Sequence, residues 1–170
     1  IKCNYGDYDT QNDIAYFSKR CEIHDKASVI IGDTVYYNRT TGVGDLYGDV
    51  FMSDSIQKYT ITGQHAFFQE SPEYALVTGE PLYTMIDDQD DSLHIHGDTL
   101  RINIGANGKR LIRVYNNSKF FKKDFQGKCD SLVFDEGDST LRMYTDPVLW
   151  SGKSQLTAND IYMTLRNGNL

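Results

Sequence analysis

The stretch that decides the fold is GDTVYYNRTTG at residues 32–42, followed by LYGDV at residues 46–50. In the first segment apolar and polar side chains alternate, with Val35 and Tyr37 on one side, which is typical of a strand with one buried face. Residues that favour turns follow, and the second segment alternates again up to a break at Gly48. The segments therefore predict two antiparallel strands joined by a turn.

The first pattern returns along the chain as a small residue, a polar residue and an alternating strand. Its copies begin at Gly32, Gly63, Gly97, Cys129 and Ala158. The spacing of roughly 30 residues lies within the range of repeat architectures. The side chains predicted to point inward from these copies are Val35, Tyr37, Ala66, Phe68, Leu100, Ile102, Leu132, Phe134, Ile161 and Met163.

A second pattern lies between these copies, as a strand that breaks and then continues as another strand. The breaks fall at Gly48, Gly79, Asn116 and Thr145. A glycine inside a strand pattern indicates a bend or a bulge, which a curved sheet requires. The inward side chains predicted from this pattern are Leu46, Val50, Met52, Val77, Val114 and Met143.

One such repeat cannot bury its own apolar face, whereas stacked repeats form two facing sheets with a continuous interior. We therefore expect an all-β chain that forms an elongated antiparallel jellyroll from about five repeats of ~30 residues. Residues 1–170 are expected to form a single domain, with the repeats at about residues 27–165, and its end strands would be open edges. The only helix predicted is a short one over residues 11–20.

Composition narrows the classes of function. The formal net charge is -7, which argues against a nucleic-acid partner and against electrostatic docking on an anionic membrane. No apolar run approaches 18 residues, so the sequence predicts no membrane-spanning helix. Twelve Tyr and eight Phe against three Pro favour strands.

Three cysteines are present, and an odd number cannot be fully paired within one chain. Cys3 and Cys21 lie close together in the N-terminal segment and are able to pair in an oxidising compartment. The alternative is that these two and Cys129 stay reduced, and the sequence leaves both open.

The segments at residues 32–42, 46–50, 125–132 and 156–162 resemble the repeat of the OstA/LptA family, and most closely the OstA-like proteins of Bacteroidetes-type bacteria. The resemblance covers roughly residues 27–165. It implies a twisted, V-shaped two-sheet jellyroll, in the periplasm or associated with the outer membrane, that shields the acyl chains of lipopolysaccharide in an apolar groove. The inward side chains of both patterns are then the candidates for lining that groove.

The resemblance also implies which molecules this chain would bind. The partners would be lipopolysaccharide through its lipid A, and related LptC- and LptD-like jellyrolls, with edge-to-edge self-association into a bridge to the outer membrane. It implies a lipid-binding module without catalytic residues or a cofactor, and therefore not an enzyme.

Two other classes of function stay open from the residues alone. One is a structural or carbohydrate-binding β-repeat protein of the cell surface, which predicts a filled core and exposed aromatic rings. The other is a metalloenzyme that uses His94 and His96, which alternate on one face of a strand, but the expected third ligand is missing. The acidic residues 87–91 lack the glycine and the closing glutamate of a calcium loop, so no metal site is predicted.

Overall fold

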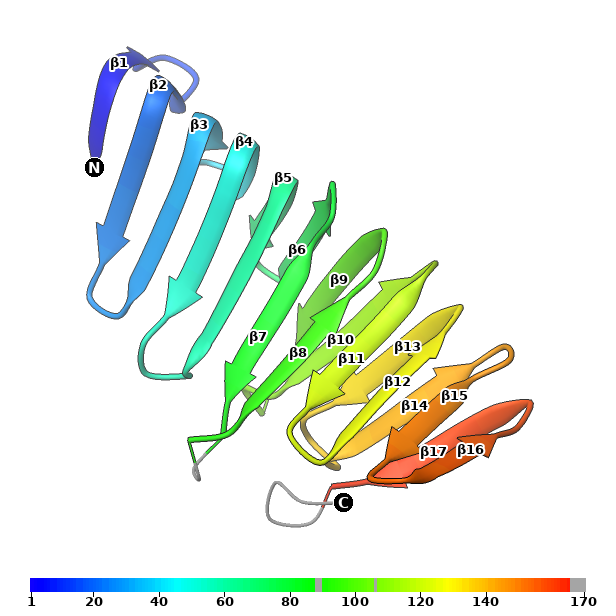
Figure 1. Cartoon of the computed structure of the whole chain (residues 1–170). Coiled ribbons are helices and arrows are strands. Elements are labelled where there is room, and N and C mark those ends of the chain that lie inside the picture. Colours follow the sequence, from blue (N-terminus) through cyan, green and yellow to red (C-terminus); the bar gives the residue numbers. More distant parts are fainter. Residues whose placement is uncertain (88–89, 106, 166–170) are drawn as a thin grey trace.

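The computed structural model describes residues 1–87, 90–105 and 107–165, and the regular elements in these ranges are all β-strands. Seventeen strands form one hydrogen-bonded network with antiparallel pairing. They follow one another along an elongated molecule, with the N-terminus at one end and the C-terminal strands at the other (Figure 1). The prediction of an all-β antiparallel jellyroll is confirmed.

The first five strands pair in sequence order, and β2 to β5 bend near the middle. The bend coincides with a shift of pairing register in β2, β3 and β4, where residues on both strands are skipped. The bounds are β1 Lys2–Asp9, β2 Ile14–Asp25, β3 Ser28–Asn38, β4 Val43–Asp54 and β5 Tyr59–Glu70.

The network divides into two sheets at β5. Residues 59–62 of β5 pair with β7, whereas residues 65–70 pair with β6. Sheet I continues as β7 (Leu82–Ile86), β8 (Ser92–His96), β11 (Ser118–Lys122), β12 (Phe125–Cys129), β15 (Val148–Ser151) and β16 (Ser154–Thr157). Sheet II continues as β6 (Glu73–Thr78), β9 (Thr99–Ile104), β10 (Arg110–Tyr115), β13 (Ser131–Asp135), β14 (Thr140–Tyr144) and β17 (Asp160–Thr164).

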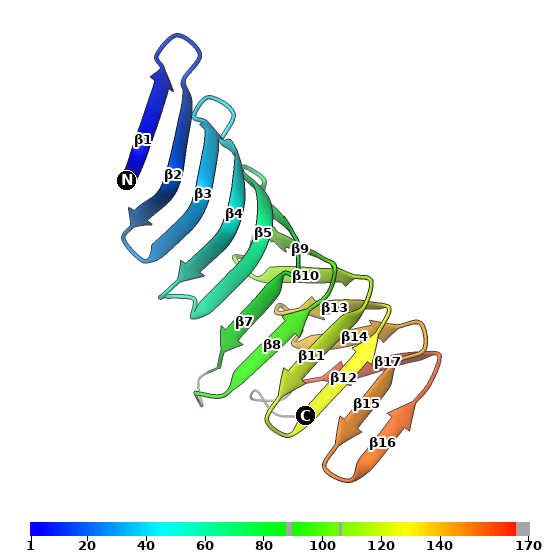
Figure 2. The ribbon, with the colours of Figure 1, turned by 45° about the horizontal axis from the view of Figure 1, so that its top comes forward.

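The long strands β2 to β5 contribute one half to each sheet, and the chain then alternates between the sheets in hairpins. Figure 2 shows the strands of sheet I in front of those of sheet II, with the long bent strands leading into both. The halves of β2 to β5 that continue into sheet I are residues 21–25, 28–32, 50–54 and 59–62, and those that continue into sheet II are residues 14–18, 34–38, 43–47 and 65–70.

The corner between the sheets is built by the two patterns seen in the sequence. At the predicted breaks, residues 48–49, 79–80, 116–117 and 145–146 take the left-handed backbone conformation, with φ between +41° and +76°. Gly48 has a second reason to be glycine, because an added Cβ would come within 2.5 Å of a carboxylate oxygen of Asp33. The bends predicted at Gly48 and Gly79 are therefore confirmed, and the same backbone conformation persists at Asn116 and Thr145, where the glycine is lost.

The helix predicted over residues 11–20 is wrong. Residues 11–13 form a turn, and β2 begins at Ile14. Lys19 and Arg20 have φ values of 61° and 66°, so they form a further corner of the same kind. Because neither is a glycine, the pattern did not reveal this extra repeat.

The core is a set of continuous rows of side chains that run across the strands. Each residue of the longest row is the direct cross-strand partner of the next. All of its members are at most 5% exposed. In order across sheet II they are Val35, Leu46, Ala66, Val77, Leu100, Val114, Leu132, Met143 and Ile161.

Candidate ligand-binding groove

Most of the side chains predicted to line a groove are packed core residues. Tyr37, Met52 and Phe68 alone among them keep part of their surface exposed. The others are buried at the junction of the sheets or between them: Val35, Leu46, Val50, Ala66, Val77, Leu100, Ile102, Val114, Leu132, Phe134, Met143, Ile161 and Met163. The sequence thus predicted which face points inward, but not which inward residues stay accessible.

A hollow of about 350 Å³ lies between the two sheets beside β5, where the partly exposed residues gather. Its volume is within the range of small-molecule sites in proteins, at the lower end. Ile30, Met52 and Ile61 line it from sheet I, and Phe68, Ala75 and Ile102 line it from sheet II. The lining is mostly apolar and comes from residues as far apart in the sequence as Ser28 and Arg110, which the facing sheets bring together.

The wall of the hollow follows from the strand register. Ile23, Ile30, Met52 and Ile61 form one row across the N-terminal half of sheet I, and Ile23, Ile30 and Met52 are partly exposed. The same row continues as Tyr83, Ile95 and Phe120, which are buried. The interior is therefore open to solvent at β2 to β5 and closed further along the chain.

Arg110 closes the interior where β5 gives way to the two separate sheets. Its guanidinium lies 4.5 Å from the centroid of the Tyr59 ring and 6.0 Å from that of Tyr83, so it reaches from sheet II to the facing sheet. Its Nη2 and Nε donate to the Glu136 carboxylate at 2.7 and 3.1 Å. Arg110 is 3% exposed, and its Nη1 has no hydrogen-bond partner among the described residues.

Burial and the charge of Arg110 have opposite effects on the pKa values of Glu136 and Tyr83. Burial alone raises the pKa of Glu136, but hydrogen bonds from the side chain and backbone of Arg110 outweigh it and lower that pKa. Burial also raises the pKa of the Tyr83 phenol, despite the opposing charge of Arg110. The closure therefore consists of the ion pair of the buried Arg110 with Glu136, beside the neutral phenol rings of Tyr59 and Tyr83.

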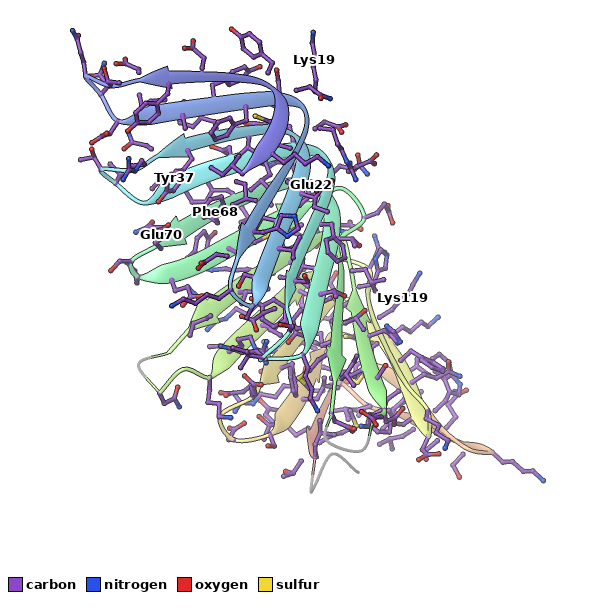
Figure 3. All side chains as sticks on the ribbon, turned by 90° about the vertical axis from the view of Figure 1, so that its left-hand side faces the viewer. Lys19, Glu22, Tyr37, Phe68, Glu70 and Lys119 are labelled. Carbon is purple, nitrogen blue, oxygen red and sulfur yellow. The ribbon has the colours of Figure 1, made fainter. Side chains whose placement is uncertain are left out.

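The rim of the hollow is acidic. Tyr37 stacks against Phe68 with ring centroids 6.0 Å apart, and its hydroxyl donates to Glu70 at 2.7 Å. Figure 3 shows these three side chains close together on one side of the ribbon. Burial, reinforced by the charge of Asp54, raises the pKa of Glu73, which also lines the hollow. A ligand whose polar group stays at this rim therefore meets carboxylates rather than cations.

Several residues of the groove escaped the sequence reasoning. Ile30, Ile61 and Ala75 belong to the same alternation as the predicted residues, so extending the pattern to every strand would have found them. Arg110 carried no such signal, because a charged residue in a strand is normally taken as exposed.

The candidate metal ligands do not form a site. His94 and His96 point away from the buried Leu93 and Ile95, as expected. No group of three or more potential ligands was found anywhere in the part of the chain that the structure describes. Of the acidic run, Asp88 and Gln89 lie outside the described residues, while Asp87 and Asp91 form ion pairs with the buried Lys122.

No helix long and apolar enough to cross a bilayer was found among the described residues. No known family model and no curated protein matches the sequence. Among solved structures, the chain is similar to LptH of Pseudomonas aeruginosa, described as the LptA homologous periplasmic component of the conserved lipopolysaccharide transport device. The TM-score is 0.62 at 15% identity, and the match covers 70% of this chain and 82% of LptH. The repeat pattern, the corners and this likeness agree that the chain has the β-jellyroll fold of LptH, an LptA homologue.

Proposed function

We propose that this chain is a periplasmic module that binds lipopolysaccharide by taking its acyl chains into the hollow between the sheets. The single observation that carries the proposal is the apolar hollow beside β5, in a fold shared with a lipopolysaccharide-transport protein. We propose transport rather than catalysis because the solved structure that shares the fold is a component of a transport device.

The driving force is burial of apolar surface. Ile30, Met52 and Phe68 line the hollow and are partly exposed, so an acyl chain bound there would remove both its own surface and theirs from water. Each methylene buried contributes about 0.8 kcal/mol. About ten buried methylenes would therefore contribute about 8 kcal/mol, the order of a micromolar dissociation constant before the cost of ordering the chain.

Handing the lipid onward requires contact with further jellyrolls, and both ends of the molecule suit such contact. Among the described residues, β1 pairs only with β2, β16 only with β15 and β17 only with β14, so each end presents strands with one unpaired side. Unpaired strand edges invite pairing with another chain. We propose that these edges join a second copy or LptC- and LptD-like jellyrolls into a bridge towards the outer membrane.

Lipid A binding measured by displacement of an apolar fluorescent dye tests the first part of the proposal. Ala75→Phe places a ring in the hollow, while Leu76→Phe on the same strand adds a similar ring on the outer face and serves as the matched control. We expect Ala75→Phe to weaken lipid A binding at least tenfold and Leu76→Phe to leave it unchanged, with both variants folded by circular dichroism. Wild-type protein that fails to bind lipid A, or an Ala75→Phe variant that binds normally, would overturn the proposal.

The alternative of a purely structural surface protein required a filled core. The hollow beside β5 is the observation against it, although the interior is filled in the C-terminal half. Sedimentation of the chain over a range of concentrations addresses the bridge separately, because end-to-end pairing predicts a series of oligomers rather than one closed dimer.

A further inference from the structure

The outer face of sheet I carries two side-chain rows that lipid binding in the interior does not use. The basic row consists of His96, Lys119 and Lys128, each opposite the next on neighbouring strands. The aromatic row runs beside it and consists, in cross-strand order, of His94, Phe121, Gln126, Trp150 and Gln155. In the view of Figure 3, Lys119 lies on the opposite side of the ribbon from the residues at the rim of the hollow.

The basic row has no neutralising partner on its own face. Lys119 and Lys128 are direct cross-strand partners, an arrangement of like charges that destabilises a sheet. Although the chain has 24 Asp and Glu, the outward positions of β7, β8, β11, β12, β15 and β16 hold none. Outside these positions, Oε2 of Glu80 in the corner before β7 lies 3.4 Å from Nε2 of His96, and Asp124 lines a hollow that adjoins the aromatic row. An anionic ligand would remove this local repulsion.

The face is also concave. A hollow of about 310 Å³ is lined by both rows, among them His96, Lys119 and Trp150. A second hollow of about 190 Å³ shares Phe121, Gln126 and Trp150 with the first, so the two adjoin along the aromatic row. Phe121 is 51% exposed, which leaves a large part of its ring free for a ligand.

The polar groups in the aromatic row are suited to hydroxyl groups. Trp150 donates its Nε1 hydrogen to Oε1 of Gln155 at 2.8 Å, which fixes the indole and leaves the amide nitrogen of that glutamine to donate elsewhere. The amide of Gln126, between Phe121 and Trp150 in the row, adds a further donor and acceptor. Lys128 Nζ lies 6.0 Å from the centroid of the Trp150 ring, so the two rows meet there.

We propose that this face binds an anionic glycan, an oligosaccharide that bears carboxylate or phosphate groups. Flat aromatic rings pack against the C–H faces of sugar rings, side-chain amides bond sugar hydroxyls, and lysines bind carboxylate or phosphate. An apolar ligand would leave the lysines uncompensated, and a net charge of -7 disfavours nucleic acid. The site lies on the other face of sheet I from the interior hollow and does not depend on lipid binding there.

The test measures binding of the full chain to four probes by isothermal titration calorimetry: alginate oligosaccharide for carboxylate, phosphomannan oligosaccharide for phosphate, neutral dextran oligosaccharide, and oligothymidylate. We expect binding of at least one anionic glycan, at least tenfold tighter than dextran and oligothymidylate, and weakened by salt. The first two probes show which anionic group the site prefers. The proposal would be overturned if dextran bound as tightly as both anionic glycans, or if oligothymidylate bound as tightly as the anionic glycans or more tightly. It would also be overturned if no glycan bound.

Variants separate a specific site from general attraction between charges. Lys119→Glu is expected to weaken glycan binding at least tenfold, and Trp150→Ala and Phe121→Ala at least fivefold. The matched control is Arg101→Glu on the outer face of sheet II, because Arg101 is exposed and also faces a cation, Arg113, across the strands. An equal loss in Arg101→Glu, or no loss in either aromatic variant, would contradict the proposal. Phe121→Ala serves where Trp150→Ala fails to fold, since the Phe121 ring is half exposed.

Discussion

The guanidinium of Arg110 lies over the ring of Tyr59, 4.5 Å from its centroid, and this contact marks the place where the open interior of the jellyroll ends. On one side of it the facing rows are partly exposed, and on the other they are buried. The contact joins a strand of sheet II to the bent strand from which both sheets continue.

Arg110→Met should destabilise the fold, because it leaves the carboxylate of Glu136 without its partner in a site where that side chain is 20% exposed. Breaking a buried ion pair costs about 3–5 kcal/mol, and the remaining exposure of Glu136 places the expected loss near about 3 kcal/mol. Urea denaturation followed by circular dichroism measures it. Arg101→Met, at an exposed position, should change stability by less than about 0.5 kcal/mol. Two equal losses would show that Arg110 is no special contact.

Stability should fall in acid through Glu136. The pKa of this carboxyl is lowered in the folded state, because the hydrogen bonds from Arg110 outweigh the effect of burial. Its contribution is therefore complete above the ordinary carboxyl pKa and is lost as the pH falls through the lowered folded value. Glu136→Gln should flatten the dependence of unfolding free energy on pH in that window. An unchanged slope in the variant would exclude Glu136 as the source.

Glu73 should act in the opposite sense. Burial raises its pKa, so the folded state holds this proton more tightly than the unfolded chain and is weakened as the pH rises above the ordinary carboxyl pKa. Glu73→Gln should therefore raise stability at neutral pH while leaving it nearly unchanged below the ordinary pKa. Chemical denaturation at both pH values gives the comparison, and a variant less stable than wild type at neutral pH would refute it.

Thr145→Asn should stabilise the chain. Thr145 is β-branched and has a φ of 63°, a conformation that costs an L-residue roughly 1–2 kcal/mol and that asparagine tolerates best after glycine. We expect a gain of about 1 kcal/mol, seen as a higher thermal midpoint. Thr164→Asn, at an exposed strand position with ordinary backbone, is the control and should bring no gain. A gain in both variants would argue against relief of strain at the corner.

Cys3 and Cys21 should form a disulfide in an oxidising environment. They are direct cross-strand partners on β1 and β2, and such partners have Cα atoms about 4.5–5.5 Å apart, within the range that a disulfide spans. Exposure to oxidised glutathione should convert the two thiols to one disulfide while two glutathione thiols are released. Intact mass after alkylation measures the remaining thiols.

Cys129 provides the internal control for that oxidation. Burial raises the pKa of its thiol to about 11, so little reactive thiolate is present near neutral pH. We expect one remaining thiol, at Cys129, when the unfolded wild type is alkylated after oxidation. The Cys3→Ser variant, which keeps Cys21 and Cys129, should show two thiols, or one where glutathione adds to Cys21. Three thiols in the oxidised wild type would show that the strand pairing at β1 does not hold the cysteines together.

The repeat could be predicted from the sequence because the strand pattern and the corner pattern agree. Val35, Ala66, Leu100, Leu132 and Ile161 were placed on one inward face, and they occupy alternate places in the longest buried row. Alternation decides which side chains point inward, since successive residues of a strand face opposite sides. Alternation carries no information about the distance between the two sheets.

That distance is why the groove itself could not be predicted. Phe134 and Phe68 occupy the same inward position in their repeats, yet the first is buried and the second lines the hollow. The difference arises from how closely the two sheets approach, which is set by packing across the interior, as where Arg110 of sheet II reaches Tyr59 and Tyr83. The corner at Lys19 was missed for a local reason, because its left-handed backbone is formed without a glycine such as those at Gly48 and Gly79.

The corners have a consequence for how such a chain can change. After each corner, the next strand places its inward side chains in the same cross-strand rows as the strand before it, whatever the residues at the corner. A whole repeat inserted or deleted at a hairpin would change the length of the molecule and leave its cross-section unchanged. The length of the jellyroll and the width of its interior can thus change independently. Duplication of a short gene segment would lengthen the molecule without widening the interior.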